Sequence, residues 1–114
     1  MKILKNKEQK IIFFNILSFG TTLKGEILIN GDFRVDGTLD GSVQCENLII
    51  GSPGYIDGLI KCKNVEISGK VNGDIYASEL IILNKDAKVN GNIFTSKLIV
   101  ELGATLSANC NMKN

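Results

Sequence analysis

A five-residue pattern, in which apolar residues stand two positions before and two positions after a glycine, recurs along this chain. Its most regular copies are Val71-Asn72-Gly73-Asp74-Ile75 and Val89-Asn90-Gly91-Asn92-Ile93. The central residue is glycine at positions 25, 41, 58, 73 and 91 and alanine at position 108, so successive copies are 16, 17, 15, 18 and 17 residues apart. A near-constant period of this kind indicates a repeat architecture, in which each repeat buries its apolar face against its neighbours.

Further apolar positions recur at fixed distances of four, seven and nine residues after the central residue. Side chains two residues apart lie on the same face of a strand, so each repeat is expected to contain at least two short strands. In the repeat centred on Gly73, this spacing predicts Leu80 and Ile82 as an inward pair. In the repeat centred on Gly25, the pair is expected one residue later, at Phe33 and Val35, because of an insertion near Asn30 and Gly31.

The columns of equivalent residues exclude an antiparallel meander, because hairpins reverse the chain and would not stack identical motifs on one another. They predict an all-β, single-domain parallel β-helix of about six coils, each of 15–18 residues. Successive coils would lie about 4.8 Å apart. We expect the β-helix to span residues 16–110, between an N-terminal tail (1–15) and a short C-terminal tail (111–114).

The N-terminal tail differs from the body in charge. Residues 1–10 contain four lysines and one glutamate, and mostly apolar residues follow as far as Phe19. Lysines with neighbouring aromatic and aliphatic side chains are typical of a membrane-surface anchor. The residues expected to form this anchor are Lys7, Lys10, Ile11, Ile12, Phe13 and Phe14. Two alternatives remain open: a signal peptide, although no typical cleavage site follows, or a segment that closes the first coil.

Several kinds of chemistry are disfavoured by the residues present. The chain contains no histidine, which excludes a histidine-based catalytic pair and the chemistry of hexapeptide acyltransferases, whose coils have a similar length. It has no phosphate-binding glycine motif and no basic patch in the body, so we expect no nucleotide, cofactor, metal or nucleic acid as a ligand. The recurring acidic residues fit a solvated face better than the carboxylate pair of a polysaccharide-cleaving enzyme.

Two of the three cysteines, Cys45 and Cys62, occupy equivalent positions on successive coils. Stacking would bring their Cα atoms to about 5 Å, which a disulfide tolerates. The same column contains Ile29, Ala77 and Thr95, so we interpret both cysteines primarily as small buried core residues. The absence of a paired C-x-x-C motif favours a reducing compartment.

The ends of the predicted β-helix are the main indication of function. A parallel coil stack leaves unpaired backbone groups at both ends, and solenoids normally cover these ends with polar elements. Here both terminal coils are apolar, which favours end-to-end polymerisation. The residues expected at the N-terminal interface are Ile16, Leu17, Phe19, Leu23 and Ile27, and those at the C-terminal interface are Leu106, Cys110 and Met112. The pattern does not determine whether like or unlike ends meet.

The chain resembles the bactofilins, a bacterial cytoskeletal family, over residues 16–110. The resemblance is carried by Gly20-Thr21-Thr22-Leu23-Lys24-Gly25-Glu26-Ile27, by Val35-Asp36-Gly37-Thr38-Leu39-Asp40-Gly41-Ser42-Val43, and by the repeated Val-Asn-Gly-[Asp/Asn]-Ile coils. It implies a right-handed, triangular β-helix that forms non-polar filaments without nucleotide. It also implies a location at the inner face of the cytoplasmic membrane and a role in cell shape through peptidoglycan-modifying enzymes.

We therefore expect a self-assembling scaffold and not an enzyme. The alternative is a non-polymerising β-helix that docks a protein partner on one face. A polysaccharide-acting enzyme is the least favoured hypothesis, since it would need a carboxylate pair that the sequence does not identify.

Overall fold

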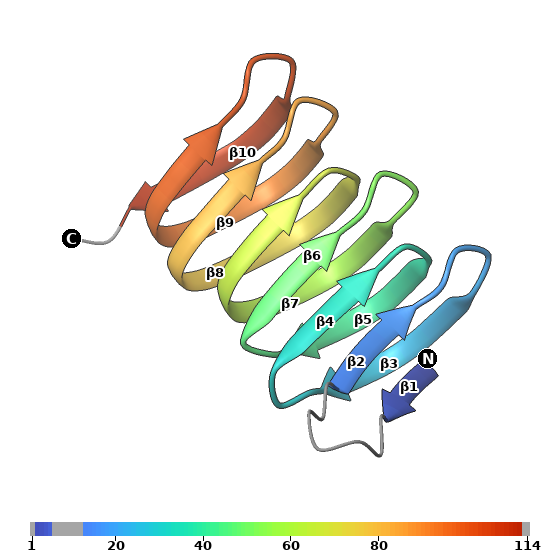
Figure 1. Cartoon of the computed structure of the whole chain (residues 1–114). Coiled ribbons are helices and arrows are strands. Elements are labelled where there is room, and N and C mark those ends of the chain that lie inside the picture. Colours follow the sequence, from blue (N-terminus) through green and yellow to red (C-terminus); the bar gives the residue numbers. More distant parts are fainter. Residues whose placement is uncertain (1, 6–12, 113–114) are drawn as a thin grey trace.

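A computed structural model describes residues 2–5 and 13–112, and it shows a single stack of β-strand coils (Figure 1). The strands are β1 (Lys2–Lys5), β2 (Phe13–Leu17), β3 (Thr22–Leu28), β4 (Asp32–Val35), β5 (Thr38–Gln44), β6 (Asn47–Ile50), β7 (Tyr55–Ile67), β8 (Lys70–Leu83), β9 (Lys88–Val100) and β10 (Thr105–Met112). All pairings except β1–β2 are parallel. The predicted parallel β-helix of about six coils is confirmed.

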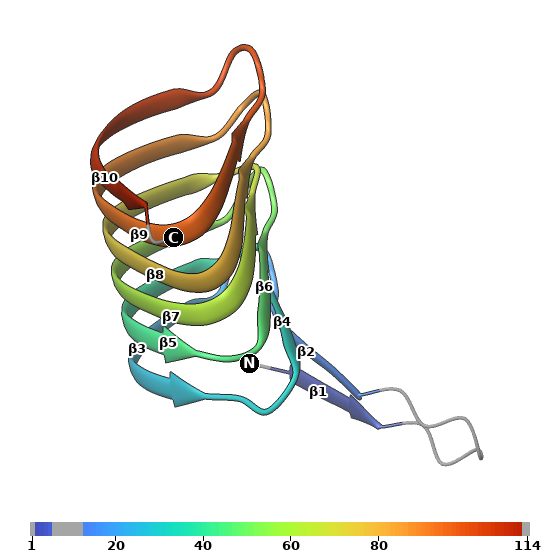
Figure 2. The same cartoon turned by 90° about the vertical axis from the view of Figure 1, so that its left-hand side faces the viewer.

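One side of the β-helix, which we call the glycine wall, consists of β3, β5, β10 and the first parts of β7, β8 and β9. Its strands pair so that Gly25, Gly41, Gly58, Gly73 and Gly91 stand in one column, with Ala108 at its C-terminal end. The apolar residues two positions to either side form two further columns in the same register. Figure 2 shows the coils stacked on this wall. The register predicted from the repeat is therefore confirmed.

The other side, the second wall, consists of β2, β4, β6 and the last parts of β7, β8 and β9. Phe33 and Val35 pair with Leu48 and Ile50, as expected for an insertion in the first coil. The expectation for the coil centred on Gly73 was wrong. The fully buried residues there are Ile81 and Leu83, whereas Leu80 and Ile82 are only half-buried. An extra residue between Ala77 and Leu80 shifts the register by one position.

The variable coil length has two structural causes. The shortest coil, from Gly58 to Gly73, contains 15 residues and returns to the glycine wall through a short connection at residues 68 and 69. The connections at residues 51–54, 84–87 and 101–104 are two residues longer than this one. Each is a turn closed by a hydrogen bond from the backbone N–H of its fourth residue to the carbonyl oxygen of its first. One extra residue before the second wall lengthens two coils further, those that start at Gly25 and Gly73. These two additions account for every spacing between 15 and 18.

The interior is a continuous apolar core formed by residues from all the columns. It includes Leu39, Ile56, Val71 and Val89 from one column of the glycine wall and Val43, Ile60, Ile75 and Ile93 from another. Each side chain packs against its equivalents one coil away, so no single coil could bury its apolar surface alone. Cys45 and Cys62 belong to this core, as predicted.

The strands extend beyond the boundaries expected for the β-helix. β2 begins at Phe13, where a tail was expected to continue, and β10 ends at Met112. β1 pairs with β2 in antiparallel orientation, with Lys2 opposite Ile16 and Lys5 opposite Phe13. Residues 2–5 therefore form an additional strand at the N-terminal end of the second wall (Figure 2).

Candidate functional site

The C-terminal end of the β-helix presents an open strand edge. β10 pairs with β9 along its whole length, from Thr105 opposite Lys88 to Met112 opposite Thr95. Within the part of the chain that the structure describes, no strand pairs with the other edge of β10. Of the predicted interface residues, Leu106 is half-buried, and Cys110 and Met112 are exposed. The structure thus brings these three side chains together along one unpaired edge.

The composition of this edge is unusual for an exposed strand. β10 has the sequence Thr-Leu-Ser-Ala-Asn-Cys-Asn-Met, without a charged residue or a proline. Exposed edge strands generally contain lysine, proline or a bulge, which prevent pairing with another chain. An uncharged edge of eight residues is therefore well suited to accept another strand.

Two exposed apolar residues at this end were not among the predicted interface residues. Val100 occupies the inward column of the second wall but is 45 % exposed, because β10 covers only the glycine wall and leaves Val100 as the last member of its column. Leu102, in the following turn, is 98 % exposed. The repeat places Val100 in its apolar column but gives no indication of Leu102.

The N-terminal end has one open wall. β3 pairs with β5 on one side, and the described residues provide no partner for its other edge. Leu23 and Ile27 are half-buried on this strand, as expected for the first members of their columns. Phe19, in the preceding turn, is 77 % exposed, and Leu28, which the sequence analysis did not select, is 75 % exposed.

The second wall differs at this end because β1 occupies the outer edge of β2. Leu17 pairs with Val35 and is fully buried, and Ile16 is half-buried. The side chain of Leu17 therefore belongs to the core of the isolated chain, and its place at a polymer interface stays a prediction. Among the predicted residues at this end, Phe19 is exposed, and Ile16, Leu23 and Ile27 are half-buried.

The predicted membrane anchor falls largely outside the described residues. Lys7, Lys10, Ile11 and Ile12 are not described, whereas the backbones of Phe13 and Phe14 form the start of β2. Within the described residues, no helix has the length and hydrophobicity needed to span a bilayer.

Hydrogen-bond ladders account for several of the recurring acidic residues. Asp32 accepts a hydrogen bond from the amide group of Asn47 at 2.8 Å, and the Asn47 side chain accepts one from Asn64 at 2.9 Å. On the glycine wall, Asp74 accepts a hydrogen bond from Asn92 at 2.9 Å. These carboxylates link successive coils on the outer surface. Among the described residues, no group of three or more cysteine, aspartate or glutamate side chains is placed to hold a metal ion.

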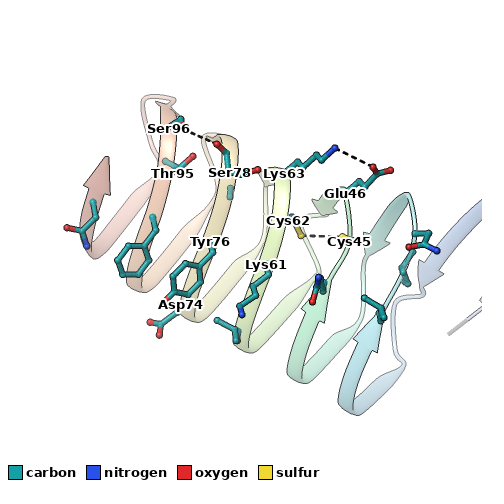
Figure 3. Close-up of a pocket in the computed structure, with 18 of the residues that line it drawn as sticks. Cys45, Glu46, Lys61, Cys62, Lys63, Asp74, Tyr76, Ser78, Thr95 and Ser96 are labelled. Atoms are coloured by element: carbon teal, nitrogen blue, oxygen red, sulfur yellow. Dashed lines mark hydrogen bonds and ion pairs between the residues drawn. The ribbon is translucent and has the colours of Figure 1, made fainter. Parts of the chain in front are cut away.

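A groove of about 1040 Å³ runs along the bend between the two walls, from Leu28 near one end to Met112 near the other (Figure 3). Tyr76 and Phe94 stack on one side of it, with ring centroids 4.5 Å apart and ring planes within 5°. Cys45 and Cys62 also line this groove. The sequence repeat did not indicate the groove, because it arises where the chain bends from one wall to the other.

The comparisons with known proteins agree with this geometry. A family model named Bactofilin, described as polymer-forming cytoskeletal, matches residues 15–111. The chain is 31 % identical over 98 residues to bactofilin BacO of Myxococcus xanthus (strain DK1622), which covers 85 % of this chain and 78 % of the relative. The solid-state NMR structure of the cytoskeletal bactofilin BacA superposes with a TM-score of 0.81 at 27 % identity, and the match covers 89 % of this chain and 97 % of that one. The chain therefore belongs to the bactofilin family of polymer-forming cytoskeletal proteins.

Proposed function

We propose that this protein polymerises end to end, without nucleotide, into non-polar filaments at the inner face of the cytoplasmic membrane. Bactofilins are structural cytoskeletal proteins and not enzymes. The observation that carries the proposal is the uncharged edge of β10, together with the edge of β3 at the opposite end, neither of which is paired with another strand among residues 2–5 and 13–112. Backbone donors and acceptors at both edges are available to a second copy of the chain.

The sequence of β3 favours contact between two N-terminal ends. If two copies of β3 pair in antiparallel orientation about a two-fold axis at Gly25, Lys24 of each copy faces Glu26 of the other. The same axis places Leu23 opposite Ile27. Each lysine then lies opposite a glutamate, and each apolar side chain lies opposite another apolar side chain. Cross-strand pairs of both kinds stabilise an antiparallel pair of strands.

The C-terminal edge has a similar internal symmetry. An antiparallel pair of β10 strands about Ala108 places Leu106 opposite Cys110 and Ser107 opposite Asn109. Apolar residues then remain on the inner face and small polar residues on the outer face. Contacts between like ends at both termini produce a filament without polarity.

Membrane attachment is the proposed role of the N-terminal residues. Four lysines within the first ten residues would attract anionic lipid headgroups. A filament attached in this way could contribute to bacterial cell shape or position peptidoglycan-modifying enzymes, as the family resemblance implies.

Sedimentation of interface variants tests the polymerisation proposal. Leu106→Arg and Met112→Arg each place a charge at the C-terminal edge, and we expect both to remain in the supernatant under conditions where the wild type pellets. Leu59→Arg is a matched control, because Leu59 lies on the glycine wall in a central coil, between Ser42 and Asp74. Met112 is exposed, so Met112→Arg tests the contact without disturbing the core. If Met112→Arg and Leu106→Arg both pellet like the wild type, β10 is not the interface.

The alternative function is a non-polymerising module that binds a protein partner. It is supported by β1, which occupies part of the N-terminal end, and by the long groove between the walls. This function predicts small particles whose size does not depend on protein concentration. It also predicts that Leu59→Arg, in the middle of the groove, weakens partner binding more than Met112→Arg, at the end of the groove.

A further inference from the structure

Cys45 and Cys62 face each other across neighbouring coils. Their sulfur atoms are 3.2 Å apart, and the backbone N–H of Cys45 donates a 3.2 Å hydrogen bond to the carbonyl oxygen of Lys61. Figure 3 shows the two thiols at the bend between the walls. Neighbouring strands are separated by about 4.8 Å, which lies within the Cα separations that a disulfide accommodates. A small rotation of the two side chains would therefore bring the sulfur atoms to bonding distance.

The two thiols are reachable from solvent through the groove. Each cysteine retains 8 % exposure, and both belong to the groove lining. The equivalent positions on the next two coils are Ala77 and Thr95, which are 2 % and 3 % exposed. A small oxidant can therefore reach the cysteine pair through the groove.

The two thiols differ in acidity. The pKa of Cys62 is lowered by its hydrogen bond with the Cys45 side chain; burial opposes this shift, and a backbone hydrogen bond from Cys45 reinforces it. The pKa of Cys45 is raised by its hydrogen bond with Cys62, by burial, and by the negative charges of Cys62, Asp32 and Glu46. The thiolate is the reactive form, and either cysteine can supply it, because either sulfur atom can donate the hydrogen bond that joins the pair.

We propose that Cys45 and Cys62 form an oxidation site at which a small hydroperoxide converts the two thiols into a disulfide between neighbouring coils. The thiolate of one cysteine attacks one peroxide oxygen, the O–O bond breaks, and that cysteine becomes a sulfenic acid while hydroxide, or an alkoxide from an organic hydroperoxide, leaves and takes up a proton. The sulfur of the other cysteine then attacks the sulfenic acid sulfur, forming the S–S bond and releasing water with the proton of the second thiol. For hydrogen peroxide, two thiols and one peroxide give one disulfide and two waters. A small thiol that enters the groove reverses the reaction by exchange and is itself oxidised to its disulfide.

Mass spectrometry of the folded full-length chain tests this site. The test uses a Cys110→Ser background, which removes the third, exposed cysteine. After hydrogen peroxide treatment, we expect the protein to be lighter than the untreated protein by two hydrogen atoms. Neither Cys45 nor Cys62 should then react with an alkylating reagent, and treatment with a small thiol should make both alkylatable again. Trypsin should release the segment 35–61, which contains Cys45, linked to the dipeptide Cys62-Lys63.

Single variants test whether the linked peptide needs both thiols. Cys45→Ala and Cys62→Ala each leave one thiol of the pair, so oxidation of either variant should stop at a sulfenic acid, which dimedone traps, and neither variant should give the linked peptide. Circular dichroism establishes that each variant is folded. The proposal is overturned if both thiols of the folded background protein remain alkylatable after peroxide treatment. It is also overturned if the two cysteines oxidise independently to sulfinic acids without forming the linked peptide.

Discussion

Gly58 lies in register directly above Gly41, and the two residues have φ angles of 146° and 147°. A Cβ atom on Gly58 would overlap the carbonyl oxygen of Gly41. The glycine column therefore has two physical causes, a backbone conformation that L-residues rarely adopt and the close approach of neighbouring coils. Gly25, at the open N-terminal edge, shares the positive φ of 126°, but a Cβ there would meet no atom within 4 Å.

This difference predicts unequal effects for two alanine substitutions. Gly58→Ala should lower the free energy of unfolding by about 1–3 kcal/mol more than Gly25→Ala, because it adds an overlap with a neighbouring coil to the backbone strain that both variants share. Denaturant unfolding in a Met112→Arg background, chosen to limit assembly, measures both values. Equal destabilisation would contradict the close-packing explanation of the column.

The shifted register of the fourth coil predicts which isoleucine is in the core. Ile81→Ala should cost about 2–5 kcal/mol of stability, as is usual for a fully buried aliphatic side chain. Ile82→Ala should cost markedly less, since Ile82 is half-buried on the outer face. Thermal or denaturant unfolding of the two variants compares them directly. A larger loss for Ile82→Ala would restore the register expected from the simple repeat.

The same coil shows why the inward-facing positions could be predicted from the sequence on the glycine wall but not on the second wall. On the glycine wall, each coil contains a glycine or alanine that fixes the phase, and the register was predicted correctly. On the second wall, residues 80–83 read Leu-Ile-Ile-Leu, so no polar residue reveals which alternate positions face inward. The extra residue near Ala77 therefore could not be located from the pattern.

The candidate interface was predicted in part for a similar reason. Leu106 and Met112 follow the repeat to its last strand, so their position at the edge could be inferred. The strand β1 could not, because Lys2–Lys5 has no counterpart in the repeat, and its pairing with β2 depends on tertiary structure. This pairing closes part of the N-terminal end, where the sequence had left open both an exposed interface and a segment that closes the first coil.

Disulfide crosslinking distinguishes the two possible filament polarities. Both chains carry Cys45→Ala and Cys62→Ala, which remove the buried thiols. The first chain adds Leu23→Cys, Ile27→Cys and Cys110→Ser. It should crosslink between subunits, because the proposed two-fold axis places position 23 of one subunit opposite position 27 of the other. The matched chain combines Ile27→Cys with the native Cys110. It should not crosslink, since these positions meet only if β3 of one subunit stacks on β10 of another. Non-reducing electrophoresis of oxidised filaments gives the result, and the reverse pattern would indicate a polar filament.

Charge neutralisation tests the proposed anchor without removing β1. Lys7→Gln with Lys10→Gln should weaken binding to anionic vesicles by about 1 kcal/mol per lysine, and added salt should reduce the difference. The control is Lys85→Gln with Lys88→Gln, two exposed lysines on the body of the β-helix. Co-sedimentation with vesicles measures both. Equal binding by the two double variants would exclude a specific role for the tail lysines.

The most direct test of the central claim is negative-stain electron microscopy of the purified chain, combined with sedimentation, in the absence of nucleotide. We predict filaments about as wide as one β-helix and recovery of the protein in the pellet. Small uniform particles that remain in the supernatant at every concentration would contradict polymerisation through the open ends. That result would favour the binding module, with β1 as a genuine cap of the N-terminal end.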